Sequence, residues 1–155
     1  MTYRIYDWKR LQDDGTPREL HIDKAMAAIH FGSTPPTPAG PLEVCRRGLR
    51  RAVLAACPFF AAEIVRVSRP ARIVAGCQTF RIVLGKTGRV TFRHGAAEAT
   101  VAPGQALLIP ACFGDFEVTG EGTYLDYYVP DLETDIICPL LECGHSRDRI
   151  EALMS

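Results

Sequence analysis

The sequence has no apolar run approaching the roughly 20 residues that a membrane-spanning helix requires. Its first ten residues, "MTYRIYDWKR", lack both the apolar core and the cleavage site of a signal peptide. An excess of one charge is also missing, because eighteen basic residues balance eighteen acidic residues. Nothing in the net charge therefore attracts nucleic acid or an anionic membrane. These absences predict a cytoplasmic protein whose partners include neither nucleic acid nor a membrane.

A dense cysteine framework is absent as well. The six cysteines lie scattered through apolar segments of a chain whose 155 residues are the usual size of one domain. Small secreted domains held together by disulfides have a much higher density of cysteine. We therefore expect reduced thiols at Cys45, Cys57, Cys77, Cys112, Cys138 and Cys143.

Residues 1–31 have the pattern of a strand, a turn and a short helix. The segment "TYRIYDW", residues 2–8, is rich in residues that favour strands, and "DDGT" then turns the chain. Thr16 and Glu19 have the spacing of a capping box, and Pro17 fits the first helical position. The pattern predicts a helix over roughly residues 17–30.

The remaining chain divides into a linker, a β-rich region and a helical tail. Prolines and glycines dominate residues 32–42, which we interpret as a linker. In residues 43–130, short runs rich in Val, Ile, Phe and Tyr alternate with Gly or Pro, as in a β-sandwich or barrel. Val90 and Phe92 alternate with polar residues, which indicates a strand with one solvated face. Residues 131–155 are helical in pattern.

A cupin signature occurs in the β-rich region without its metal ligands. In "GQALLIPACFGDFEV", Gly104 and Pro110 have the spacing of the second cupin motif, but Asp115 stands where a metal-binding His is expected. The first motif should carry two His and one Glu, and "RIVAGCQTF" supplies only Gln78 as the nearest equivalent. Imidazole nitrogen and carboxylate oxygen are the ligands that such a metal prefers. We therefore predict a mostly β, cupin (RmlC-like) jelly-roll barrel that binds no metal.

The stretch "TYRIYDWKRLQDDGTPRELHIDKAMAAI" resembles a segment of the short bacterial type I mannose-6-phosphate isomerases, which reads "TYR-x-YD-x-x-R" and then "PRELH". These enzymes end in a second, metal-free cupin, and "CPFF" and "GQALLIPA" are similar to motifs of that domain. The resemblance covers residues 2 to about 130. It implies a metal-free barrel preceded by the end of a catalytic barrel.

The resemblance also implies site residues. The family interconverts mannose 6-phosphate and fructose 6-phosphate, using zinc and a cationic side chain to stabilise an enediolate-like intermediate. The family's catalytic arginine corresponds to Arg4, and a basic residue that helps to hold the substrate phosphate corresponds to Arg10. Guanidinium groups suit both a developing oxyanion and a phosphate dianion. From the residues alone, both would be interpreted as solvated charges.

This sequence departs from the family at the zinc ligands. All four precede the "TYR" segment, whereas here Met1 stands directly before Thr2. The four histidines of the chain match no family motif: His21, His30, His94 and His145. We therefore expect the chain to correspond to the C-terminal half of an isomerase, without zinc-dependent isomerisation of its own.

Three functional hypotheses remain open from the sequence. The chain is a truncated or split isomerase whose zinc half is separate, a regulatory cupin that binds a sugar or sugar phosphate, or a module that only dimerises. A strand at residues 2–8 with unpaired amides would be an exposed edge that tends to pair with another strand. The strand could fold back onto the chain's own sheet, pair with another copy or dock into a separate zinc half. For the chain in isolation we expect the second, a homodimer formed by mutual strand addition.

Two further clusters have simple interpretations. Cys138, Cys143 and His145 offer three zinc-ligand types, but their spacing fits no common zinc motif, and we favour free thiols at a helix end. The basic run formed by Arg46, Arg47, Arg50 and Arg51 is interpreted as a solvated face.

Overall fold

The computed structural model of the protein describes residues 2–29, 31–32, 40–46, 49–74 and 79–154. The chain divides into two compact units, Met1–Thr37 and Pro38–Ser155. Most of the predicted linker, together with Gln78 and Cys77, lies outside the described residues. Among the described residues, no helix is both long and apolar enough to cross a membrane.

The described residues of the first unit contain the helix α1 (Ile22–Ala28) and no strand at residues 2–8. The predicted strand is wrong for this chain, because a strand is stable only when a neighbour satisfies its amides. The backbone N–H of His21 instead donates to the carbonyl of Arg4 at 2.7 Å. Trp8 and Lys9 then turn the chain with positive φ angles of 49° and 55°.

Helix α1 begins later than the predicted capping box. The N–H and hydroxyl of Thr16 both donate to Oδ1 of Asp14, at 2.9 and 2.6 Å. This local turn competes with helix formation at Thr16, since the residue cannot serve the turn and the N-cap together. His21 takes the N-cap position, with no side-chain hydrogen bond to the helix.

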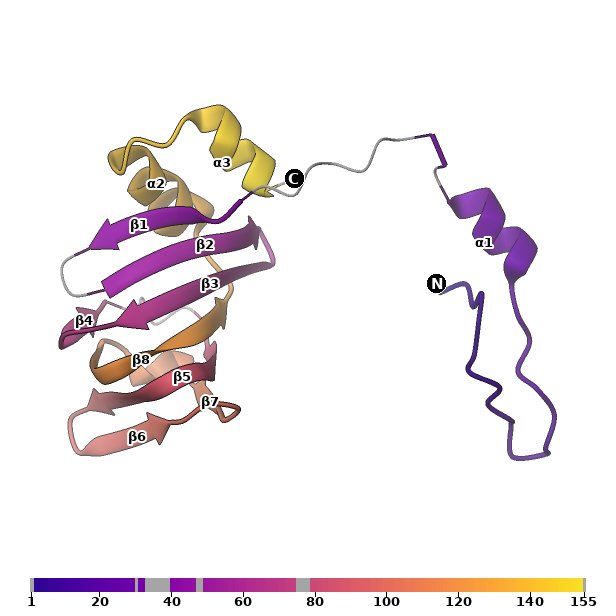
Figure 1. Ribbon diagram of the computed structural model, residues 1–155, viewed down its shortest axis with the longest axis horizontal. Helices are drawn as coiled ribbons and strands as arrows, with labels where there is room; N and C mark the ends of the chain where they lie inside the picture. Colours follow the sequence, from indigo (N-terminus) through magenta and orange to yellow (C-terminus); the bar gives the residue numbers. More distant parts are fainter. Residues whose placement is uncertain (1, 30, 33–39, 47–48, 75–78, 155) are drawn as a thin grey trace. The chain divides into compact units, whose positions relative to one another are not determined.

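The second unit is built on one eight-stranded antiparallel sheet (Figure 1). Its strands are β1 (Leu42–Arg46), β2 (Leu49–Cys57), β3 (Phe60–Val67), β4 (Ala71–Ile73), β5 (Arg81–His94), β6 (Ala97–Val101), β7 (Ala106–Ile109) and β8 (Phe116–Tyr128). The order across the sheet is β1-β2-β3-β8-β5-β6, with β4 paired to β8 and β7 paired to β5. The mostly β prediction for this region is confirmed.

The long strands β5 and β8 organise this sheet. Strand β5 pairs with β7 at its start and with β6 at its end, while β8 pairs first with β4 and then with β3. The predicted alternation is confirmed, because Val90 and Phe92 are buried and the residues between them are not. Gly95, at φ 57°, lies in the predicted hairpin tip between β5 and β6, where glycine adopts this backbone conformation without strain.

Two hydrophobic clusters lie along the inner face of the sheet. One gathers residues such as Val65, Phe92 and Tyr124 from the strands. The other joins Val53 and Tyr128 to the C-terminal helices, which are η2 (Leu132–Ile137), α2 (Cys138–Glu142) and α3 (Arg147–Met154). The helical tail is confirmed, and Figure 1 shows α2 and α3 beside β1 and β2.

Candidate functional site

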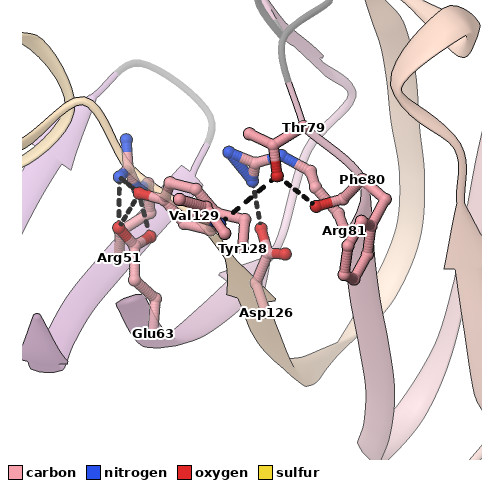
Figure 2. A network of polar contacts seen from close by, with 8 residues as sticks. All are labelled: Arg51, Glu63, Thr79, Phe80, Arg81, Asp126, Tyr128 and Val129. Carbon is pink, nitrogen blue, oxygen red and sulfur yellow. Dashed lines mark hydrogen bonds and ion pairs between the residues drawn. The ribbon is translucent and has the colours of Figure 1, made fainter. Parts of the chain in front are cut away.

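A network of charged side chains is buried on the inner face between the two clusters (Figure 2). Arg51 of β2 donates to both carboxylate oxygens of Glu63 on β3, with Nε 2.6 Å from Oε2. The hydroxyl of Tyr128 on β8 donates to Oε1 of Glu63 at 2.7 Å. Only 1% of Glu63 is exposed, so these bonds replace its hydration.

A second ion pair lies beside the first. Nη1 of Arg81 on β5 donates to Oδ2 of Asp126 on β8 at 2.6 Å. The guanidinium carbon of Arg81 also lies 4.0 Å from the ring centroid of Tyr128, which is a cation–π distance. Tyr128 thus contacts both pairs, through its hydroxyl and through its ring. We call Arg51, Glu63, Arg81, Asp126 and Tyr128 the inner network.

The strand register places the two acids of the inner network directly opposite each other, since Glu63 pairs with Asp126 between β3 and β8. Two buried carboxylates at such a position repel each other unless each has a cation. Arg51 and Arg81 supply those cations from the flanking strands. The network is therefore balanced in charge.

Burial shifts the protonation equilibria of this network. It raises the pKa of Asp126, and the neighbouring Arg81 guanidinium offsets only part of this effect. Burial and then the charge of Glu63 raise the pKa of the Tyr128 hydroxyl. Burial acts to lower the pKa of Arg51, but the hydrogen bond and charge of Glu63 bring it above the ordinary arginine value. Both Arg51 and Tyr128 therefore keep their protons at neutral pH.

A cavity of about 130 Å³ adjoins the inner network. Arg51, Arg81 and Asp126 line it together with Thr134 and Asp135 of η2. A zinc ion does not fit this set, because it would meet two guanidinium groups while both network acids are already paired. Nor does the described part of the chain contain a group of three or more His, Cys, Asp or Glu residues that could hold a metal.

A sequence comparison identifies the family to which this region belongs. The family model described as "Mannose-6-phosphate isomerase, cupin domain" matches residues 51–129, a span that includes every residue of the inner network. The chain belongs to this family.

Individual relatives agree with this cupin-domain assignment. The mannose-6-phosphate isomerase of Streptococcus mutans is 28% identical over 77% of this chain and 37% of its own length. The probable mannose-6-phosphate isomerase GmuF of Bacillus subtilis is 30% identical over 77% of this chain and 37% of its own length. The chain therefore spans well under half of these curated relatives.

A solved structure confirms the predicted cupin fold. The crystal structure of mannose 6-phosphate isomerase from Bacillus subtilis aligns with a TM-score of 0.64 and 23% identity, covering 81% of this chain and 39% of that one. At this level of identity the likeness concerns the fold alone. The inner network therefore lies within the cupin domain of the mannose-6-phosphate isomerase family, while its cavity is also lined by Thr134 and Asp135, which follow the matched residues.

The two arginines implied by the family resemblance lie in the first unit. The Arg4 side chain contacts Asp7, with Nε 3.6 Å from Oδ1, and its Nη1 donates to the carbonyl of Glu19 at 3.1 Å. Arg10 is exposed, and its backbone N–H donates to the carbonyl of Asp7 at 2.9 Å. Their proposed roles in isomerisation stay predictions.

The residues that replace or suggest metal ligands have other contacts. Asp115 lies 3.1 Å from Nη2 of Arg72, and its carbonyl contacts the ring of His94. The His145 ring lies 2.8 Å from the carbonyl oxygen of Glu43. Cys138 and Cys143 are exposed free thiols, as expected.

Sequence reasoning missed the inner network. The solvated interpretation of the basic run is wrong for Arg51, whose side chain is only 16% exposed and is paired with Glu63. A signal for the acid was present, since Glu63 alternates with Ala61 and Val65 at inward positions of "FAAEIVRV". An acid at an inward position of a strand requires a buried cation.

Proposed function

We propose that this chain supplies the metal-free cupin of a mannose-6-phosphate isomerase and does not catalyse isomerisation by itself. The observation that carries the proposal is the inner network: Glu63 and Asp126, the buried acids of the described barrel, are both paired with arginines and are not free to hold a metal. The zinc-bearing part would come from residues outside this chain. Residues of that part would hold the zinc, which would supply Lewis-acid polarisation of the substrate carbonyl.

The first unit would contribute positive charge to that shared active site. Arg10 is exposed and available to bind the phosphate of the substrate, while Arg4 is held in place by Asp7 and by the Glu19 carbonyl. Displacing the weak Asp7 contact would free the Arg4 guanidinium for an oxyanion. Arg4 is therefore proposed as catalytic and Arg10 as substrate-binding.

A coupled assay of mannose 6-phosphate turnover tests this proposal. We expect no turnover from the chain alone and no stoichiometric zinc by elemental analysis. Fusing the residues that precede the matched region in the Streptococcus mutans isomerase to this chain should restore turnover, which Arg4→Ala should remove. Exposed Arg69→Ala in the second unit is the matched control. Turnover by the chain alone, with one zinc per chain, would contradict the proposal.

A regulatory cupin that binds a sugar is the second candidate, and the cavity beside the inner network favours it. Because each arginine that lines the cavity is paired with a carboxylate and Asp135 accepts a backbone N–H, the cavity suits a neutral hydroxylated compound better than an ion. Isothermal titration with uncharged hexoses measures this directly. Saturable binding by a chain that lacks isomerase activity in the fusion as well would favour this candidate over the first.

Dimerisation through residues 2–8 is a proposal supported by exposure. In this segment Trp8 is 78% exposed and Tyr6 is 61% exposed, which leaves apolar area that a second copy could cover. Light scattering at roughly 50 µM should give a dimer that the Tyr6→Ser/Trp8→Ser variant loses. Phe59→Ser, at an equally exposed aromatic residue of the second unit, should stay dimeric. A monomeric parent protein would refute this proposal.

A further inference from the structure

A row of polar residues crosses the outer face of the sheet, on the side opposite the inner network. Arg50 of β2 pairs in register with Arg66 of β3, and Arg66 pairs with Thr123 of β8. Thr123 pairs in turn with Thr87 of β5. Neighbouring strands are about 4.8 Å apart, so the four side chains form a continuous row across four strands.

An irregularity in β5 adds a third cation to this row. The register between β5 and β8 shifts between Gly85 and Thr87, and Lys86 lies at that bulge. A bulge redirects a side chain that regular alternation would place elsewhere. Lys86 consequently lines one open groove of about 380 Å³ with Arg50, Arg66, Thr87 and Thr123, which we call the outer groove.

The cations of the outer groove differ from other exposed arginines of this unit. Arg72 pairs with Asp115 at 3.1 Å, and Arg93 pairs with Glu98 at 3.5 Å. Within the described residues, Arg50, Arg66 and Lys86 form no ion pair. Like charges directly opposite each other on two strands repel each other, so a bound anion would relieve the repulsion between Arg50 and Arg66.

We infer that the outer groove binds a phosphate group. Two guanidinium groups and one ammonium group match a doubly charged tetrahedral oxyanion, and the Thr87 and Thr123 hydroxyls add donors at the same place. Glu43 is the one acid that lines the groove in the described chain. Arg51 also lines the groove, but it is paired with Glu63. The three remaining cations against Glu43 leave a surplus of two positive charges, equal to the charge of a phosphate monoester.

The groove also offers contacts for an organic group attached to the phosphate. Ala52 and Ile64, which pair in register two residues along from the two arginines and so on the same face, are half-buried and line the same groove. A small carbon skeleton can therefore lie on apolar surface while its phosphate lies over the cations. This inference does not depend on the proposed function, because the three cations that would bind the phosphate, Arg50, Arg66 and Lys86, all lie outside the inner network.

Binding is tested on the full chain by ¹⁵N NMR and thermal shift at constant ionic strength. Titration with inorganic phosphate and with glycerol phosphate should shift the Thr87 and Thr123 amides saturably, at concentrations of about 10 mM or below. Arg50→Gln/Arg66→Gln should weaken binding at least about tenfold. Arg72→Gln/Arg93→Gln removes the same number of charges outside the groove and should bind as the parent does. If the first double variant does not fold, Lys86→Gln provides the same comparison.

The two probes distinguish the source of the phosphate. Tighter binding of glycerol phosphate would support contact with Ala52 and Ile64, and equal binding would support recognition of phosphate alone. Absence of saturable shifts, or equal weakening by both double variants, would overturn the inference. Binding of an oligonucleotide with no response to either small phosphate would overturn it as well, by showing a surface for polyanions.

Discussion

On the inner face of the sheet, Arg51 and Arg81 each lie against a buried carboxylate, whereas on the outer face Arg50 and Arg66 lie opposite each other. Arg50 and Arg51 are adjacent in the sequence, so one position of strand alternation separates these environments. On the inner face each charge requires a partner, because a buried charge has lost its hydration and would otherwise be uncompensated. The solvated outer face tolerates like charges and leaves them available to a ligand.

Removal of a carboxylate from the inner face should reduce stability more than any other substitution considered below. Glu63→Leu leaves the Arg51 guanidinium without its anion and should lower the free energy of unfolding by about 3–5 kcal/mol. Urea denaturation followed by circular dichroism measures the change. The double variant Arg51→Met/Glu63→Leu should recover most of it, because an apolar pair requires no desolvated charge. Failure of the second substitution to recover stability would show that the pair is not the cause.

Asp126→Asn should have a smaller effect, a loss of about 2 kcal/mol. The amide retains a hydrogen-bond acceptor for Arg81, and the ionised carboxylate that it replaces is already disfavoured by burial. The same denaturation experiment measures the loss. A decrease as large as that of Glu63→Leu would mean that Arg81 depends on the charge of Asp126 alone.

The difference in the free energy of unfolding between the parent protein and Asp126→Asn should depend on pH in a definite direction. The raised pKa of Asp126 means that the folded state binds the proton more tightly than the unfolded chain does. This contribution to stability is present near the ordinary pKa of 3.8 and is lost as the pH rises through the folded value. The stability advantage of the parent protein over Asp126→Asn should therefore shrink as the pH rises from 4. A growing advantage would reverse the assignment.

Removing a tyrosine hydroxyl should affect stability differently on the two faces of the sheet. Tyr128→Phe removes the bond to Glu63 but keeps the ring against Arg81, and should cost about 1 kcal/mol. Tyr127 is the preceding residue of β8 and belongs to the outer face, so Tyr127→Phe should be nearly neutral. Thermal unfolding of the two variants provides a matched test, and equal effects would contradict the inward role of Tyr128.

The smallest expected effect is a gain on the outer face. Arg66→Glu places opposite charges on a cross-strand pair with Arg50 and should stabilise the protein by roughly 0.5 kcal/mol, limited by solvent screening. The same substitution should abolish phosphate binding in the outer groove. Denaturation at low and at high salt checks the gain, which should decrease as salt screens the new pair.

Local patterns were sufficient to predict much of the second unit. The alternation at Val90 and Phe92 predicted a strand and its buried side, and the Gly95 segment predicted a hairpin. Both depend on neighbours only a few residues away. The cupin motif at Gly104 and Pro110 likewise identified the fold without its metal ligands.

Features that depend on distant partners could not be predicted in this way. The segment 2–8 has strand-forming residues but no pairing strand among the described residues of its unit, and Thr16 bonds to Asp14 instead of capping a helix. The interpretation of Arg51 failed because a run of arginines conceals strand alternation. Its pairing with Glu63, and the opposition of Glu63 and Asp126, depend on a register that no local pattern specifies.

The position of β8 also has a consequence for the order of folding. This strand is the last to leave the ribosome, yet it lies between β3 and β5, and its Tyr128 reaches Glu63 across 65 residues of sequence. Until β8 is synthesised, the facing edges of β3 and β5 have no partner, and Arg51 and Glu63 lack the tyrosine that completes their bonds. Such non-local closure slows folding and leaves nascent edges open to other chains. We therefore expect the sheet to be completed when β8 inserts between β3 and β5, and not by adding strands in chain order.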